Sequence, residues 1–304
     1  MPATFFATLV GLFALCGSSC PQLVRPVPPL PRVLPPTPTL EQVIQAVNQN
    51  NSQIYAFSTN EASISGPGYP SLRASLAFQR PRQFRLRAET SITGPEIDLG
   101  STPDLFWFWV RRSQPPAIYF CRYDQFAASR VRQAIPIEPE WLIEAMGIGV
   151  FDAGLAHQGP YWRGGNRLEI HTIRPTPEGP TMKITVVDAA SAVILEQHVF
   201  DGQGRLRASS YSEAHRRDPA TGLIMPGVVR VNCPPAQFSM RVDLGPVAIN
   251  RLLGNPAELW TMPTYSGSPA VDLCDPRLDF SRPNGPAAAV RPEAYPGESR
   301  NLLR

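Results

Sequence analysis

Apolar and polar residues alternate over two neighbouring stretches, and this alternation constrains the fold more than any other feature of the sequence. Residues 72–79 read LRASLAFQ, and residues 84–89 read FRLRAE after a break at Arg80-Pro81. Because successive side chains of a β-strand point to opposite faces of a sheet, each stretch predicts a strand with one dry and one wet face. The 35 prolines point the same way, since a proline inside a helix removes a backbone donor and clashes with the preceding turn. The chain therefore favours a sheet over a bundle of helices.

More strands are expected further along the chain. Residues 105–110, LFWFWV, are apolar at every position, so this strand must be covered on both of its faces. Asp201-Gly202-Gln203-Gly204 predicts a hairpin turn, because glycine adopts positive φ at little cost. The other predicted strands are 117–120, 167–173, 181–187, 193–200, 205–211, 227–232 and 237–244.

Three segments carry helical signals. Thr39 is followed three residues later by Gln42, which is typical of a capping box, and apolar residues then recur at helical spacing up to Val47. Shorter helices are expected at 124–132 and 138–146, where Gly147 suits the C-terminal stop. These elements predict an α+β fold, an antiparallel β-sheet curled into an incomplete barrel with helices covering the open side.

The amino terminus carries an export pattern. Phe5 to Leu15 form an apolar run of signal-peptide length, too short to span a bilayer as a helix. Gly17-Ser18-Ser19-Cys20 resembles the lipobox of bacterial lipoproteins, which makes Cys20 the predicted lipid anchor. A plain signal peptide or a short buried segment are the alternatives, because Met1 to Thr4 contain no Lys or Arg. With an anchor at Cys20, the membrane is a partner and the protein lies in the cell envelope, facing the periplasm or the exterior.

Composition divides the chain into four parts. We expect a lipoprotein-type signal peptide at 1–20, a Pro-rich linker in extended polyproline II conformation at 21–38, one folded domain at 39–265 and a disordered Pro/Gly-rich tail at 266–304. Export places Cys121, Cys233 and Cys274 in an oxidising compartment, where three cysteines allow at most one disulfide. The sequence does not choose the pair.

Motifs for chemistry are scarce in the sequence. There is no GxSxG, HExxH or Walker motif, the four histidines lack metal-ligand spacing, and a net charge of +3 does not favour nucleic acid as a partner. We therefore expect no catalytic residue, no metal and no cofactor. Ser212, Glu213, His215 and Asp218 can be drawn as a hydrolase set, but residues this close along a hairpin rarely converge on one point.

Three motifs together resemble a known superfamily. They are LAFQRPRQFR at 76–85, the aromatic strand FWFW at 106–109, and the stretch from Val187-Asp188 to the turn Asp201–Gly204. With the signal sequence and the first helix, they resemble the LolA/LolB-like outer-membrane lipoprotein-sorting superfamily over roughly residues 39–250. The resemblance implies an incomplete β-barrel whose apolar interior holds acyl chains of a lipoprotein or another lipid. A membrane-anchored chain is similar to LolB more than to the soluble LolA.

An apolar stripe supplies the candidates for such a cavity, although the same residues can equally form ordinary core. The expected function is a carrier or receptor without chemical turnover, and the alternative is a structural or protein-interaction envelope lipoprotein with a filled barrel. Basic residues near the stripe are candidates for contact with anionic headgroups, or else are solvated strand faces. The cavity candidates are Phe84, Leu86, Leu105, Trp107, Trp109 and Tyr119, and the headgroup candidates are Arg85, Arg87, Arg111 and Arg112.

Overall fold

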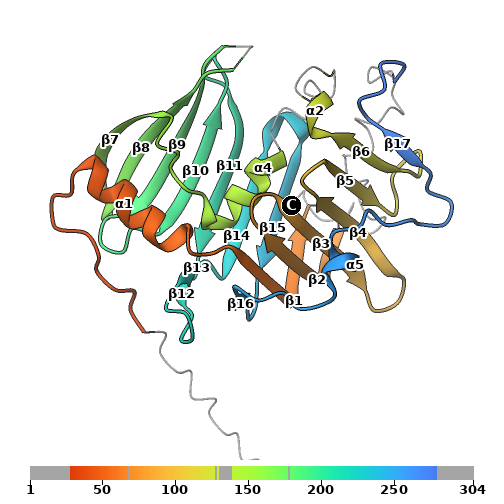
Figure 1. Cartoon of the computed structure of the whole chain (residues 1–304), viewed down its shortest axis with the longest axis horizontal. Helices are drawn as coiled ribbons and strands as arrows, with labels where there is room; N and C mark the ends of the chain where they lie inside the picture. Colours follow the sequence, from red (N-terminus) through yellow and green to blue (C-terminus); the bar gives the residue numbers. More distant parts are fainter. Residues whose placement is uncertain (1–27, 68, 127–128, 130–138, 177–178, 279–304) are drawn as a thin grey trace, which may run out of the picture.

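One large, mostly antiparallel sheet dominates the computed structural model, which describes residues 28–67, 69–126, 129, 139–176 and 179–278 (Figure 1). The predicted signal peptide with Cys20 lies outside the described residues. Within the described residues, no helix has the length and the apolar character needed to cross a lipid bilayer.

Two meanders make up the sheet. The first contains β1 (Ala56–Gly66), β2 (Tyr69–Gln79), β3 (Gln83–Thr90), β4 (Gly94–Ser101), β5 (Leu105–Val110) and β6 (Ile118–Arg122). The second contains β7 (Ala156–Arg163), β8 (Arg167–Arg174), β9 (Thr181–Asp188), β10 (Ile194–Phe200), β11 (Leu206–Glu213), β14 (Val228–Cys233) and β15 (Phe238–Asp243). Short β12 (Arg216–Arg217) and β13 (Ile224–Met225) form a separate hairpin between β11 and β14.

The meanders join where β1 pairs with β15, with Ile64 opposite Val242. The strand order is β17-β6-β5-β4-β3-β2-β1-β15-β14-β11-β10-β9-β8-β7, and β16 (Ala248–Ile249) also pairs with β1. Since β7 and β17 (Ala270–Asp272) end this order without pairing with each other, the curled sheet is an incomplete barrel. Its expected fold class is confirmed.

Helices cover what we call the inner face of the sheet (Figure 1). Helix α1 (Leu40–Asn51) packs Val43 and Val47 against Leu168 and Ile170 of β8. The predicted capping box is confirmed, because the Gln42 N–H donates to Thr39 Oγ1 at 3.3 Å and the Thr39 N–H donates to Gln42 Oε1 at 2.9 Å. Helix α4 (Pro139–Ile143) continues into a π-helical turn η1 (Glu144–Ile148), and both lie over the centre of the sheet.

The predicted helices match the structure unevenly. The segment expected at 138–146 is helical from Pro139 and extends to Ile148, with Gly147 at a φ of 79° close to its end, and residue 138 lies outside the described residues. The helix expected at 124–132 corresponds to α2 (Tyr123–Phe126), and residues 127–128 and 130–132 lie outside the described residues.

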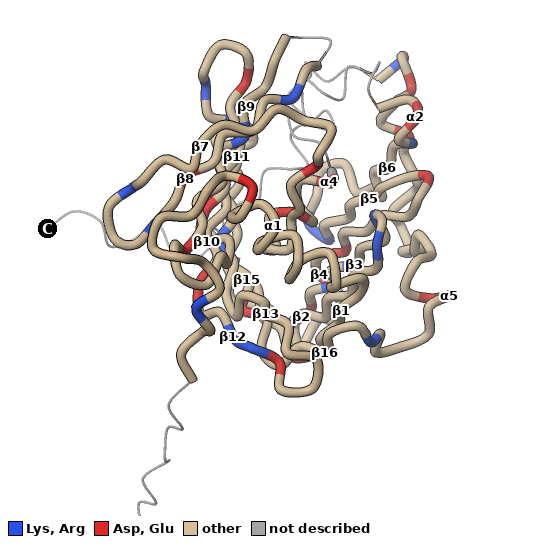
Figure 2. The backbone as a smooth tube through the Cα atoms, turned by 60° about the vertical axis from the view of Figure 1, so that its left-hand side comes forward, with Lys and Arg blue, Asp and Glu red and all other residues tan. Residues whose placement is uncertain are grey.

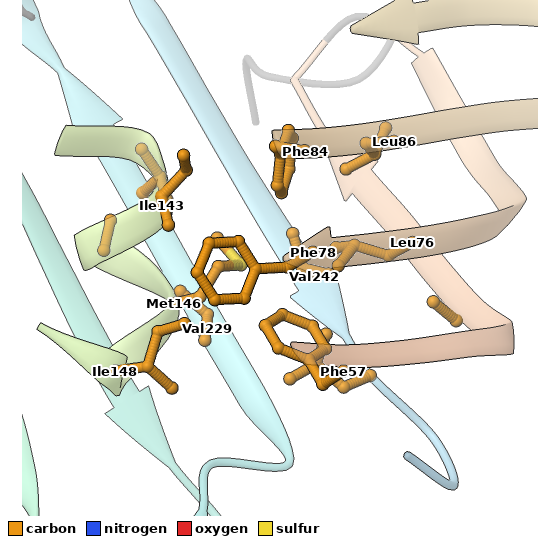
Figure 3. Close-up of a cluster of buried hydrophobic side chains, with 14 of the residues drawn as sticks. Phe57, Leu76, Phe78, Phe84, Leu86, Ile143, Met146, Ile148, Val229 and Val242 are labelled. Atoms are coloured by element: carbon orange, nitrogen blue, oxygen red, sulfur yellow. The ribbon is translucent and has the colours of Figure 1, made fainter. Parts of the chain in front are cut away.

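The main core lies where the two meanders meet. Figure 3 shows Phe57, Phe78 and Phe84 of the first meander directed toward Met146 of η1, with Val229 and Val242 beside them. Met146 is completely buried, and Phe57 and Phe78 are in contact with ring centroids 5.5 Å apart. Burial of this apolar surface contributes most of the free energy that holds the meanders together.

Both ends of the folded domain differ from the predicted boundaries. Leu34 is buried beside Val43, and the N–H groups of Val33 and Leu34 donate to the Ala190 carbonyl at 2.8 and 3.0 Å, so residues 28–38 do not form an extended stalk. At the other end, β17 pairs in parallel with β6, and a disulfide joins Cys274 to Cys121. The tail expected from residue 266 is therefore part of the fold up to residue 278.

Candidate functional site

A pocket of about 860 Å³ opens on the inner face of the second meander. Strands β8 to β11 form its floor, where Thr172, Lys183 and Val199 lie next to one another because each pairs in register with the next. Helix α4 and η1 form one wall, and the segment 150–155 forms another. Residues 174, 176 and 179–181 and the turn 201–205 that follows β10 complete the lining of the pocket.

Much of the pocket wall is apolar. Trp141 and Phe151 are largely buried, and the side chains of Leu155 and Val199 are partly exposed to the cavity. Such a surface gains free energy when a hydrocarbon group displaces water from it. The apolar residues that line the pocket are Trp141, Val150, Phe151, Leu155, Pro180, Val199 and Phe200.

Charged groups are paired around the pocket. Lys183, the only lysine of the chain, places Nζ 2.7 Å from Glu144 Oε2 and so ties the floor to η1. In the turn after β10, Asp201 accepts hydrogen bonds from the backbone N–H groups of Arg205 and Gln203 and from Arg205 Nε. These bonds, the Arg205 N–H first among them, hold the pKa of the Asp201 carboxyl below its usual value. The pocket therefore combines apolar side chains with charged groups on its floor, on the η1 wall and in this turn.

The six predicted cavity residues lie on two opposite faces of the sheet. Phe84, Leu86 and Tyr119 face inward. Leu105, Trp107 and Trp109 face outward, because β5 presents alternate residues to opposite sides and Trp107 pairs with Gly100, which in turn pairs with Arg85. The six residues therefore cannot line a single cavity, because the sheet separates the two groups.

The inward-facing members contact other side chains of the protein. Phe84 and Leu86 belong to the main core beneath α4 and η1. Tyr119 stacks on Phe108 at 5.1 Å and donates its hydroxyl hydrogen to the Pro115 carbonyl at 3.1 Å. Burial raises the pKa of Tyr119.

The outward-facing members are covered by residues 250–278, which we call the C-terminal strap. Trp109 stacks on Tyr265 with ring centroids 3.7 Å apart, and its Nε1–H donates to Ser268 Oγ at 3.1 Å. The indole of Trp107 lies over Gly100, where a Cβ atom would be 2.0 Å from it. Both faces of β5 are dry, as its sequence predicts, because the strap covers the outer one.

The four predicted headgroup residues also differ in their surroundings. Arg85 is 6% exposed, pairs with the buried Asp98 at 2.7 Å and donates to backbone carbonyls of the strap, including Thr261 at 2.8 Å. Arg87 is about half exposed, with Nε 3.8 Å from Asp98. Arg111 pairs with Glu96 at 3.3 Å, and Arg112 is exposed in the turn after β5. Arg85 is thus buried, whereas the other three reach the surface.

The residues of the hydrolase alternative do not converge. Ser212 is buried on the inner face close to Gly147, whereas Glu213 pairs with the exposed Arg230. Asp218 accepts from the N–H group of Thr221 at 2.8 Å and from its hydroxyl at 2.6 Å, within the loop that joins β12 to β13. Each of these groups therefore contacts a different part of the fold.

His215, the fourth member of that set, is held by the backbone. Its Nε2–H donates to the Ile194 carbonyl oxygen at 3.0 Å. Burial lowers the pKa of His215, and the Ile194 hydrogen bond and the charge of Asp188 oppose this shift. The imidazole thus anchors the start of β12 to the start of β10.

The pocket itself was not predicted from the sequence. Its lining comes from four separate stretches, and none of them gives a signal when taken alone. Lys183, the only lysine of the chain, shares its side of the predicted strand with Thr181 and Thr185, so the alternation does not single it out.

Comparisons with known proteins find similarity among solved structures. No family model and no curated protein matches the chain. Among solved structures, it is similar to a LolA superfamily protein from Nitrosomonas europaea (TM-score 0.46, 11% identity, 74% of this chain and 99% of that one). It is also similar to a DUF1329 family protein from Desulfovibrio piger (0.45, 12%, 71% and 96%) and to an outer-membrane lipoprotein-sorting protein domain from Vibrio parahaemolyticus (0.48, 9%, 73% and 97%).

Proposed function

We propose that the protein is an exported, lipid-anchored envelope protein that binds acyl chains of a lipoprotein or another lipid, as a carrier or receptor without chemical turnover. The observation that carries this proposal is the pocket of about 860 Å³, whose lining combines apolar and charged side chains. Its size falls within the range of roughly 300–1,000 Å³ that small-molecule sites occupy. Hydrocarbon buried against Phe151, Leu155 and Val199 gains about 25 cal/mol per Å² of apolar surface.

Two features support export and anchoring. The apolar run Phe5 to Leu15 precedes Cys20 with the spacing of a lipoprotein signal. The disulfide between Cys121 and Cys274 is of a kind that persists in oxidising compartments and is rare in the cytosol. Acylation of Cys20 would hold the protein on the membrane, and mass spectrometry of the mature amino terminus tests it.

Titration of the delipidated protein with a fluorescent fatty acid tests the pocket. We expect saturable binding that Val199→Glu weakens at least about tenfold, because a carboxylate on the floor of the pocket opposes burial of hydrocarbon. Ile184→Glu is the matched control, since Ile184 lies on the adjacent strand, is partly exposed and faces the other side of the sheet. Equal binding by the wild type and Val199→Glu would contradict the assignment of the pocket.

A structural or protein-interaction lipoprotein is the second candidate. The main core favours it, because Ile143, Met146 and Ile148 fill the space between the two meanders. Absence of saturable fatty-acid binding by a correctly folded wild type would support this candidate over the first.

A further inference from the structure

The described chain begins at one end of the molecule, the lower end in Figure 1 and in Figure 2. Three loops meet there. Ala190, in the turn between β9 and β10, accepts from the N–H groups of Val33 and Leu34, and the neighbouring Ala189 N–H donates to the Asn166 carbonyl at 2.8 Å. We call this surface the proximal end and define it as residues 28–36, 161–167, 188–193 and 214–226.

The hairpin formed by β12 and β13 is fixed to the same surface. His215 contacts the Ile194 carbonyl oxygen at 3.0 Å, directly beside the turn between β9 and β10. Asn50 at the end of α1 donates to the Ile224 carbonyl at 2.9 Å and accepts from the Ile224 N–H at 2.8 Å. The hairpin is thus held in place while its exposed residues Arg216 and Arg217 extend from the domain.

Exposed apolar side chains occur at the proximal end, where Tyr161 and Trp162 lie on opposite faces of β7. Of the five large apolar side chains that are exposed among the described residues, three belong to it: Val33 at 52%, Tyr161 at 48% and Trp162 at 58%. Arg32, Arg216 and Arg217 are exposed on the same surface. Tryptophan, tyrosine and arginine are the residues that the interface between lipid headgroups and hydrocarbon favours.

The chain before residue 28 limits how far this surface can lie from an anchor. Pro28 follows Cys20 by eight positions, so the segment between them spans at most about 28 Å when fully extended. The pocket lies toward the other ends of the same strands, because β8 runs from Arg167 at the proximal end to Arg174 at the pocket.

We propose that the proximal end rests on the lipid bilayer that holds the N-terminal anchor, with Trp162 in the headgroup interface and the pocket opening away from the membrane. This inference rests on the proposed anchor at Cys20. Arg216 and Arg217 then face the phosphate groups of the lipids, and the short tether keeps the surface at high effective concentration near them.

Quenching by brominated lipid tests this orientation in the full-length acylated protein. Vesicles of phosphatidylcholine and phosphatidylglycerol are compared with vesicles that contain brominated phosphatidylcholine. We expect bromine to quench the tryptophan emission, and Trp162→Phe to reduce that quenching at least about threefold, because Trp107, Trp109 and Trp141 are buried. Trp260→Phe is the matched control, since Trp260 is partly exposed on the strap and should leave the quenching unchanged.

Flotation of the same samples separates the two proposals. Protein that floats with the vesicles but shows no quenching retains its anchor and overturns the orientation. Protein that does not float overturns both the anchor and the orientation. If the wild-type protein shows quenching but no saturable fatty-acid binding, only the assignment of the pocket as the acyl-chain site is overturned.

Discussion

At the scale of single residues, the carboxylate of Asp98 links the strap to the outer face of β3 to β5. Its carboxylate is completely buried and accepts hydrogen bonds from Arg85 at 2.7 Å, from the Tyr265 hydroxyl at 2.7 Å and from Trp107 Nε1 at 3.3 Å. Burial, together with the charge of Asp98, raises the pKa of Tyr265 to about 12. A buried carboxylate is costly unless it is paired, so these groups act as one unit that binds the strap to the sheet.

Two arginines contact this carboxylate and provide a matched comparison. Arg85→Gln should lower the free energy of unfolding by about 3–5 kcal/mol, because it removes the buried partner of a buried charge. Arg87→Gln should cost less than about 1 kcal/mol, because Arg87 is half exposed and 3.8 Å away. Chemical denaturation measures both values, and equal losses would show that burial does not set the strength of these pairs.

At the scale of elements, strands with regular alternation or an unbroken apolar run can be predicted from the sequence, whereas strands with polar residues at buried positions cannot. The sequence predicts β2, β3 and β5, but β1 and β4 were not predicted because both carry polar residues at buried positions. Asp98 in β4 becomes compatible with burial through Arg85 and Trp107, which are on other strands, and through Tyr265 of the strap. The same limit applies to the site, since the face on which Trp107 lies depends on strand register and on the strap that covers it.

The free energy of unfolding should decrease in acid because of His215, which holds the hairpin of β12 and β13 to β10. Burial lowers the pKa of His215 in the folded state, so the unfolded chain binds its proton more readily. The resulting stability is present above about pH 6.5, the usual pKa of histidine, and is lost as the pH falls below it. Denaturation curves between about pH 5 and 7 should show a smaller dependence on pH in His215→Gln than in the wild type. An unchanged dependence would assign the effect to another group.

At the scale of the whole molecule, the position of the core explains the position of the pocket. The two meanders meet at β1 and β15, and the side chains of α4 and η1 fill the space above that junction. The pocket lies beyond η1, on the inner face of β8 to β11. The strap closes the outer face of the first meander. The disulfide between Cys274 and Cys121 joins the strap to β6.

Because one core serves both meanders, they should unfold together. Met146→Ala removes a completely buried side chain that contacts both halves of this core, and should lower the free energy of unfolding by about 2–5 kcal/mol. Tryptophan emission reports on five local positions, of which Trp107 and Trp109 lie in the first meander, whereas far-ultraviolet circular dichroism reports on the whole sheet. The two signals should give one coincident transition in the wild type, shifted equally by the substitution. Separate transitions would mean that each meander is stable without the shared core, and the junction of β1 and β15 would then be a contact between two independent units.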